Sequence, residues 1–152
     1  MQRQIIPGVI DGQQALCTLP SDATAQAAAE LMAERRVGAV MVVEHGRLLG
    51  IVTERDVVFR VVAKSRAADA TTLAEVMTRQ PETLSPQDSA MAALEKMQAG
   101  RYRHLPVLRD DEVCGMVSMR DIYEAVRHNL QEELRGAEAL IYGDQYGAST
   151  AT

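Results

Sequence analysis

The sequence predicts an α/β fold made of two β-α-β-β-α repeats, and three observations lead to this prediction. First, shifting the chain against itself by 65 positions aligns Thr18–Val61 with Thr83–Val126 without a gap, and 14 of the 44 aligned pairs are identical, which indicates a tandem duplication. Second, each copy contains a stretch with helically spaced apolar residues, two short runs rich in aliphatic residues, and another helical stretch. Third, 152 residues suffice for one domain or for two small repeats that share a core.

The elements of the first repeat follow from capping, spacing and turn signals. Ser21–Thr24 supplies helix-start residues before Ala28, Leu31 and Met32, whose spacing places them on one helix face. Glu44–Gly46 separates two apolar runs, which indicates a β-hairpin. The expected elements are a strand at Ala15–Leu19, the helix, hairpin strands at Ala39–Val43 and Leu48–Thr53, and a second helix at Glu54–Ala63.

The second repeat carries the same signals in the same order. Ser85–Ser89 precedes the helically spaced residues Ala90, Leu94 and Met97, and Arg109–Asp111 is the turn of a second hairpin. The expected elements are a strand at Glu82–Leu84, the helix, hairpin strands at Leu105–Leu108 and Val113–Ser118, and a last helix that starts at Met119 and ends near Gly136.

Composition shifts give the expected boundaries. Lys64–Thr72 is rich in Ala, Ser, Thr and charged residues and is expected to be a linker, followed by a helical turn at Leu73–Met77. The small and polar residues from Gly143 to Thr152 predict a poorly ordered tail. We therefore divide the chain into a first repeat at 8–64, a second repeat at 73–135, and a short helix with a flexible tail at 136–152.

Composition also excludes several classes of function. The formal net charge is −5, no basic run is present, and aromatic residues make up 3%, so we expect no nucleic-acid partner. Cys17 and Cys114 show neither zinc-ligand nor disulfide-framework spacing. The chain shows neither the apolar core of a signal peptide nor a run long enough to cross a membrane, so we expect a cytoplasmic protein without membrane contact. No catalytic or metal-binding constellation stands at a credible spacing, so we expect no enzyme, no metal and no required cofactor.

One motif recurs at the end of each hairpin. Gly50–Val57 reads GIVTERDV and Gly115–Ile122 reads GMVSMRDI, and this pattern resembles the cystathionine β-synthase (CBS) domain. Val76–Thr78 and Arg103–Val107 are typical of the same family, and the resemblance covers roughly Gly8 to Leu130. Two such domains in tandem form a Bateman module. The resemblance implies two three-stranded sheets packed about a pseudo-twofold axis, with two clefts between the repeats that commonly bind adenosine-containing ligands, and it implies no catalysis.

The resemblance also nominates binding residues for each cleft. In the family the Asp of the [Ser/Thr]-x-x-Asp motif holds the ribose hydroxyls, the Ser/Thr contacts phosphate, and the basic residue between them assists. Carried over by position, one cleft would use Asp121, Ser118 and Arg120, with Val37, Gly38, Ala39 and the segment from Gly12 to Ala15 around the adenine. The other cleft would use Asp56, Thr53 and Arg55, with Thr78, Arg79, Tyr102, Arg103 and His104. The first repeat has no basic residue equivalent to Arg103, and we expect the Asp121 cleft to be somewhat stronger because Arg103 and His104 stand nearby in the sequence.

Structural explanations for the same residues stay open. Thr53 with Asp56, and Ser118 with Asp121, can each form a capping box, although a capping box favours Glu or Gln over the shorter Asp at its third position. The start of a helix is also a favourable place for phosphate, so the two roles can coexist. Arg55 and Arg120 can be solvated first-turn residues, and His104 can be a structural histidine rather than a phosphate contact.

The apolar helix that follows the motif in each repeat is expected to form a dimer interface. Val57–Ala63 is apolar nearly all round, and Ile122, Val126 and Leu130 form a second stripe, so a homodimer that covers these helices is expected. The function predicted from all these features is a regulatory module that binds AMP, ADP, ATP or S-adenosylmethionine between its repeats and alters the behaviour of an unknown regulated protein. The alternative is a dimerisation or scaffold protein that binds no ligand.

Overall fold

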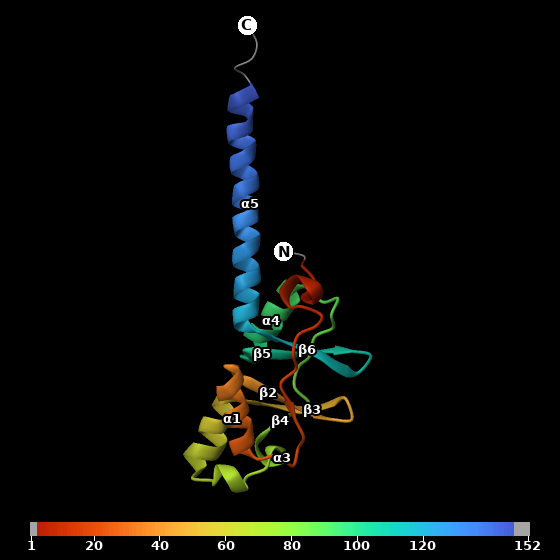
Figure 1. Cartoon of the computed structure of the whole chain (residues 1–152), viewed down its shortest axis with the longest axis vertical. Helices are drawn as coiled ribbons and strands as arrows, with labels where there is room; N and C mark the ends of the chain where they lie inside the picture. The colour runs from red at the N-terminus through yellow and green to blue at the C-terminus, as the bar shows by residue number, and fades with distance from the viewer. Residues whose placement is uncertain (1–2, 148–152) are drawn as a thin grey trace.

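The computed structural model describes residues 3–147, which form two α/β halves and one long helix that rises away from them (Figure 1). The first repeat occupies one half and the second repeat the other, with the two β-hairpins lying side by side at the junction (Figure 1). The turn of one hairpin touches the other directly, because the Val113 amide donates to the Gly46 carbonyl over 3.3 Å. The predicted α/β fold with two repeats is confirmed.

The first repeat contains the elements that its spacing predicts. After the π-helical turn η1 (Ile5–Val9) these are β1 (Thr18–Leu19), α1 (Ala25–Arg35), β2 (Ala39–Glu44), β3 (Arg47–Thr53), α2 (Glu54–Asp56), the π-helical η2 (Val57–Val61) and the 3₁₀ turn η3 (Val62–Lys64). Thr24 caps α1 by accepting a hydrogen bond from the Ala27 amide. The helix predicted over Glu54–Ala63 is therefore present as one helical run whose hydrogen-bond pattern changes along its length.

The second repeat follows the same plan and adds a longer final helix. Its elements are the 3₁₀ turn η4 (Ala68–Ala70), α3 (Leu73–Val76), β4 (Thr78–Arg79), α4 (Ala90–Gly100), β5 (His104–Arg109), β6 (Glu112–Ser118) and α5 (Met119–Gly147). Ser89 caps α4 as Thr24 caps α1. Arg36 and Arg101, which are equivalent in the two repeats, end α1 and α4 in the left-handed conformation, with φ of 54° and 58°. The duplication therefore extends to the backbone at the helix ends.

The two sheets are equivalent in position but unequal in extent. In the first sheet the order is β1-β2-β3-β4, and β4 belongs to the segment that leads into the second repeat. In the second sheet β5 and β6 pair, and the strand expected at Glu82–Leu84 is reduced to a single parallel bridge between Leu84 and Val107. At the outer edge of β6 the Gln14 side chain replaces a strand, because its amide donates to the Met116 carbonyl and accepts from the Met116 amide.

Each repeat completes its core with the segment that precedes the other repeat. Leu73 and Met77 pack with Val40, Val42 and Val52 in the core of the first repeat. In the second repeat the core contains Ile5 and Ile10, which come from the N-terminal segment, together with residues of α4, β5, β6 and α5. A helical turn was predicted at Leu73–Met77, and α3 lies there. The predicted boundary assigns this turn to the second repeat, but its residues Leu73 and Met77 pack in the core of the first repeat.

The predicted end of the last helix was wrong. Helix α5 passes through Gly136 and continues to Gly147, so it also includes the first residues of the expected tail. One glycine costs a helix about 1 kcal/mol relative to alanine, and its neighbours in Glu132–Leu140 are mainly strong helix formers. Residues 148–152 lie outside the described part of the chain. Across residues 3–147, none of the helices combines the length and apolar character that a membrane span requires.

Candidate functional site

A cavity of about 290 Å³ lies where the second repeat meets the end of β3 and the start of α2. The first repeat, with the segment that follows it, lines the cavity with Gly38, Ile51, Thr53, Glu54, Arg55, Asp56, Thr78, Pro81 and Glu82. The end of α4 and the start of β5 line it with Arg101, Tyr102, Arg103, His104 and Leu105. The residues between Gly38 and Asp56 therefore share one cavity with Arg101–Leu105, although the two segments lie at least 45 positions apart in the chain.

Asp56 is held rigidly at this cavity by the start of α2. Its Oδ2 accepts hydrogen bonds from the Thr53 amide at 2.9 Å and from the Thr53 hydroxyl at 3.2 Å, and the Asp56 amide donates to Thr53 Oγ1. Oδ1 lies 3.6 Å from Nε of Arg60, and the Asp56 side chain is 13% exposed. The capping box therefore exists with Asp at its third position, and it fixes a largely buried carboxylate beside the cavity.

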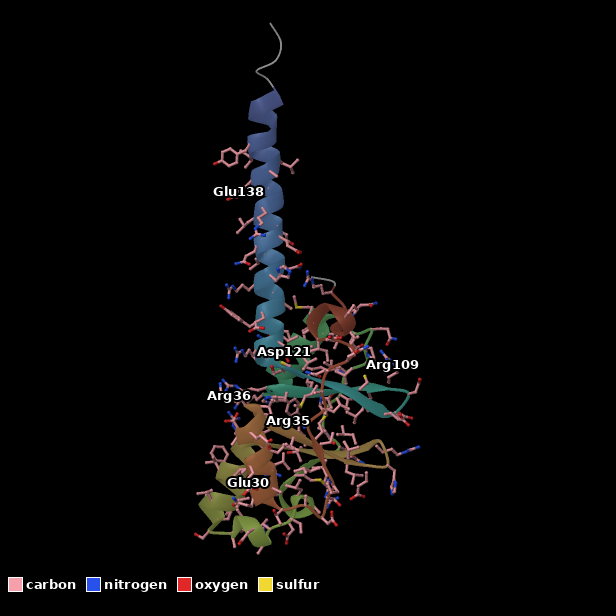
Figure 2. The ribbon with its side chains drawn as sticks, viewed as in Figure 1. Glu30, Arg35, Arg36, Arg109, Asp121 and Glu138 are labelled. Atoms are coloured by element: carbon pink, nitrogen blue, oxygen red, sulfur yellow. The ribbon has the colours of Figure 1, made fainter. Side chains whose placement is uncertain are left out.

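Asp121 occupies the equivalent position in the second repeat and makes the equivalent contacts. Its Oδ2 accepts from the Ser118 amide at 2.8 Å and from the Ser118 hydroxyl at 2.9 Å. Figure 2 shows Asp121 at the base of α5, where the helix leaves the body of the molecule. Both repeats therefore position a carboxylate in the same way, and the 290 Å³ cavity lies on the Asp56 side.

The cavity has arginines from both repeats at its rim. Arg101 and Arg103 flank Tyr102 at the end of α4, and all three side chains are exposed. Arg55 comes from α2, and its guanidinium carbon lies 6.0 Å from the centre of the Phe59 ring. Arg120, its equivalent in the second repeat, points into solvent with 86% of its side chain exposed and pairs with Glu124. The basic residue of the motif therefore lines the 290 Å³ cavity in the first repeat, whereas its equivalent in the second repeat faces solvent.

His104, from the second repeat, lies beside Gly38 of the first repeat at the cavity. A Cβ at Gly38 would contact Glu54 Oε1 and lie 3.1 Å from His104 Cε1, so the lack of a side chain at Gly38 makes room for both groups. Burial lowers the pKa of His104 below its ordinary value, and Glu54 and Asp121 oppose this shift. The imidazole is therefore neutral at neutral pH, although it lies in the field of one carboxylate from each repeat.

This burial predicts a loss of stability in mild acid. The unfolded chain binds a proton at His104 more readily than the folded chain, so the free energy of unfolding falls as the pH falls below about 6.5. Replacing His104 by glutamine removes this contribution, and the loss of melting temperature between neutral and mildly acidic pH should become smaller. His128→Gln, at a position on α5 whose side chain is 60% exposed, serves as the control for the substitution itself. An equal pH dependence in wild type and His104→Gln would contradict the assignment.

The structure brings together most of the residues nominated for the Asp56 cleft. The cavity is lined by seven of the eight: Thr53, Arg55, Asp56, Thr78, Tyr102, Arg103 and His104. Arg79 is not among the lining residues and donates to the Ala74 carbonyl instead. Arg103 and His104, on which the expectation of a stronger Asp121 cleft rests, line the cavity of Asp56. Asp121 also acts on the pKa of His104, so the relative strength of the two clefts stays a prediction.

The residues nominated around the adenine of the Asp121 cleft are less closely grouped. Gly38 lines the Asp56 cavity, Val37 faces a groove between α1 and α2, and Ala39 is fully buried in β2. Gly12 lies near Ile6, and Ala15 is exposed before β1. Sequence reasoning missed six of the lining residues: Ile51, Glu54, Pro81, Glu82, Arg101 and Leu105. The signal for Arg101 was its identity with Arg36 in the repeat alignment.

Comparison with known proteins gives the family. The CBS domain family model matches residues 1–63 and 73–128. The chain is 36% identical over 138 residues to the mitochondrial CBS domain-containing protein CBSX3 of Arabidopsis thaliana, with 88% of this chain and 66% of that protein covered. It is 39% identical over 111 residues to CBSCBSPB3 of the same organism, of which it spans only 20%.

Solved structures agree with the fold. A putative signal-transduction protein with CBS domains from Burkholderia ambifaria superposes with a TM-score of 0.76 at 30% identity and covers 82% of this chain and 93% of that one. CBS domain protein PAE2072 from Pyrobaculum aerophilum, complexed with AMP, gives a TM-score of 0.66 at 29% identity, with 72% and 84% covered. With two repeats, two equivalent capping motifs and these relatives, the chain belongs to the CBS domain family.

Proposed function

We propose that this chain is a regulatory module that binds an adenosine phosphate, such as AMP, in the cavity beside Asp56. One observation carries the proposal: a single cavity holds a rigid carboxylate from the first repeat opposite arginines from the second. A ribose offers hydroxyl donors to a carboxylate, and a phosphate is matched by guanidinium groups. The complex of the Pyrobaculum aerophilum relative with AMP supports this choice of ligand.

We assign a role to each side of the cavity. Asp56 would accept the ribose hydroxyls through Oδ1, because the capping hydrogen bonds of Asp56 use Oδ2. Arg101 and Arg103 would bind the phosphate, with the Thr53 hydroxyl at the start of the helical run as a further contact. Tyr102 and Leu105 would pack beside the base. The equivalent cleft at Asp121 stays a prediction for a second molecule.

Isothermal titration with AMP, ADP, ATP, S-adenosylmethionine and unphosphorylated adenosine tests this proposal. We expect at least one phosphate ester to bind with a dissociation constant between about 1 µM and about 1 mM, which corresponds to roughly −8 to −4 kcal/mol. Adenosine should bind more weakly than AMP, because it lacks the group that the arginines recognise. If none of these compounds gives saturable heat at millimolar concentration, the proposal fails.

Ligand binding would act on a partner protein by favouring one relative orientation of the two repeats. The cavity takes its walls from both repeats, so an occupied cavity favours the arrangement that brings Asp56 and Arg103 together. A partner that binds this arrangement more tightly would sense the ligand, and the coupling would be reciprocal. The regulated protein, the absence of catalysis and a cytoplasmic location are parts of the same proposal.

Exposed apolar side chains support the homodimer. Val58, Phe59 and Val62 are 51%, 58% and 68% exposed on the helical run that follows α2, and Tyr123, the equivalent of Val58, is 65% exposed on α5. A second copy that covers these residues would remove apolar surface from water. The same observation favours the alternative function, a scaffold that dimerises without ligand.

A further inference from the structure

The outer part of α5 extends away from the rest of the molecule. Every residue from 130 to 143 is exposed, whereas Ile122 and Ala125 near the start of the helix are buried against the second repeat. Figure 2 shows Glu138 on this outer part, far from the body, and Asp121 at its base. The tertiary contacts within one chain therefore cannot account for the apolar residues of the outer part.

These apolar residues form a continuous stripe with a heptad spacing. Leu130, Leu134, Ala137 and Ile141 follow one another at intervals of four, three and four residues. Leu130, Leu134 and Ile141 are 55%, 62% and 62% exposed. This stripe shares Leu130 with the one expected at Ile122, Val126 and Leu130, but Ile122 and Val126 pack into the core of the second repeat. A seam of this kind is typical of a helix that pairs with another helix.

We propose that the outer part of α5 pairs in the antiparallel direction with the same segment of a second copy of this chain. In a parallel pair, Glu133 beside the seam of one helix would face Glu138 of the other, and this like-charge contact would occur twice. An antiparallel pair with Leu130 opposite Ile141 of the second copy removes both contacts. The antiparallel pair instead places Glu133 of one helix beside Leu140 of the other, and Gln131 beside Glu138 of the other. The charge pattern therefore favours the antiparallel orientation.

The length of the free segment fits this arrangement. With Leu130 opposite Ile141, Leu134 faces Ala137 of the second copy, and the four facing pairs bury the whole outer stripe. The first residue of α5 in the second copy then lies beyond Gly147 of the first, so the two bodies stand at opposite ends of the paired helices. The pairing is independent of the nucleotide cavity, since none of the cavity residues lies on α5.

Sedimentation of matched variants tests the pairing. Val58→Glu serves as the parent protein because it disables the body surface proposed above for a homodimer. We expect the mass of this parent to rise with concentration from 16.6 kDa toward about twice that value. Adding Leu134→Glu should hold the mass at the monomer value, whereas adding Ala139→Glu, which places the same charge on the opposite face of the helix, should not. Association that survives Leu134→Glu, or a parent that stays monomeric up to millimolar concentration, overturns the proposal.

Cysteine cross-linking tests the direction of the pair in the protein with Cys17 and Cys114 replaced by alanine. An equimolar mixture of the Leu130→Cys and Ile141→Cys proteins should give a covalent dimer under oxidising conditions. Leu130→Cys alone should give none, because its counterpart lies at the far end of the paired segment. A dimer from Leu130→Cys alone indicates a parallel pair and overturns the antiparallel proposal. Titration of the same variants with AMP reports separately on the cavity, so either proposal can fail alone.

Discussion

Replacing Asp56 by alanine is expected to weaken AMP binding by about tenfold or more. The change removes the acceptor assigned to the ribose hydroxyls, and hydrogen bonds to a charged group contribute about 1.5–3 kcal/mol. It also removes the third residue of the capping box, which should lower the free energy of unfolding by about 0.5–2 kcal/mol. Titration calorimetry and urea unfolding of the same preparations separate the two effects.

Asp121→Ala is the matched control for this experiment. Asp121 forms the same capping hydrogen bonds with Ser118 that Asp56 forms with Thr53, but it does not line the 290 Å³ cavity. The two variants should therefore lose comparable stability, and only Asp56→Ala should lose affinity at this cavity. Asp56→Glu refines the test, because glutamate keeps the capping box while its longer side chain moves the carboxylate. Full affinity in both Asp56 variants would leave the motif with a structural role alone.

Gly50→Ala is expected to destabilise the protein and to disturb the cavity at the same time. A Cβ at this position in β3 would lie 2.7 Å from the Thr78 carbonyl oxygen and 2.7 Å from Met77 Sδ. Because the Thr78 oxygen belongs to the backbone, β4 itself must move, and overpacking of this kind costs about 1–3 kcal/mol. Thr78 lines the cavity, so AMP affinity should fall together with the melting temperature.

Gly115→Ala gives the comparison in the second repeat. A Cβ at Gly115 would lie 2.7 Å from Ile10 Cδ1 and 3.2 Å from Gln14 Oε1, both of which are ends of side chains that can rotate. We expect a smaller loss of stability than for Gly50→Ala and no change in affinity at the Asp56 cavity. Urea unfolding and AMP titration of both variants check this order. A larger loss for Gly115→Ala would show that the side chains at β6 are held more firmly than the β4 backbone.

The repeat made much of the fold predictable from the sequence. Each element of one copy supports its equivalent in the other. The hairpin strands lie within one residue of their predicted bounds, and both capped helices contain the residues whose spacing predicted them. Seven of the eight residues nominated for the Asp56 cleft line one cavity, because the resemblance to the CBS family nominates the motif of the first repeat together with the entry to β5 in the second. Thr53 and Asp56 belong to the same turn, so their spacing alone fixes their contact.

Features that depend on long-range contacts were not predictable in this way. Arg103 belongs to the same repeat as Asp121, but it lines the cavity of Asp56 across the junction between the repeats. The strand at Glu82–Leu84 shrinks to one bridge, and a glutamine side chain takes the place of a strand at β6, which no alternation of apolar residues reveals. Helix α5 passes Gly136 because glycine only disfavours a helix, whereas proline would interrupt it.

The exchange of leading segments between the repeats means that the two halves are interlocked rather than merely adjacent. A fragment that begins at the linker would lack Ile5 and Ile10, which close the core of the second repeat, and a fragment that ends there would lack Leu73 and Met77, which close the core of the first. Neither half is thus a self-sufficient folding unit. Proteolysis between residues 64 and 72 would leave two pieces that hold each other in place, so a nicked chain can keep its shape while an isolated half cannot.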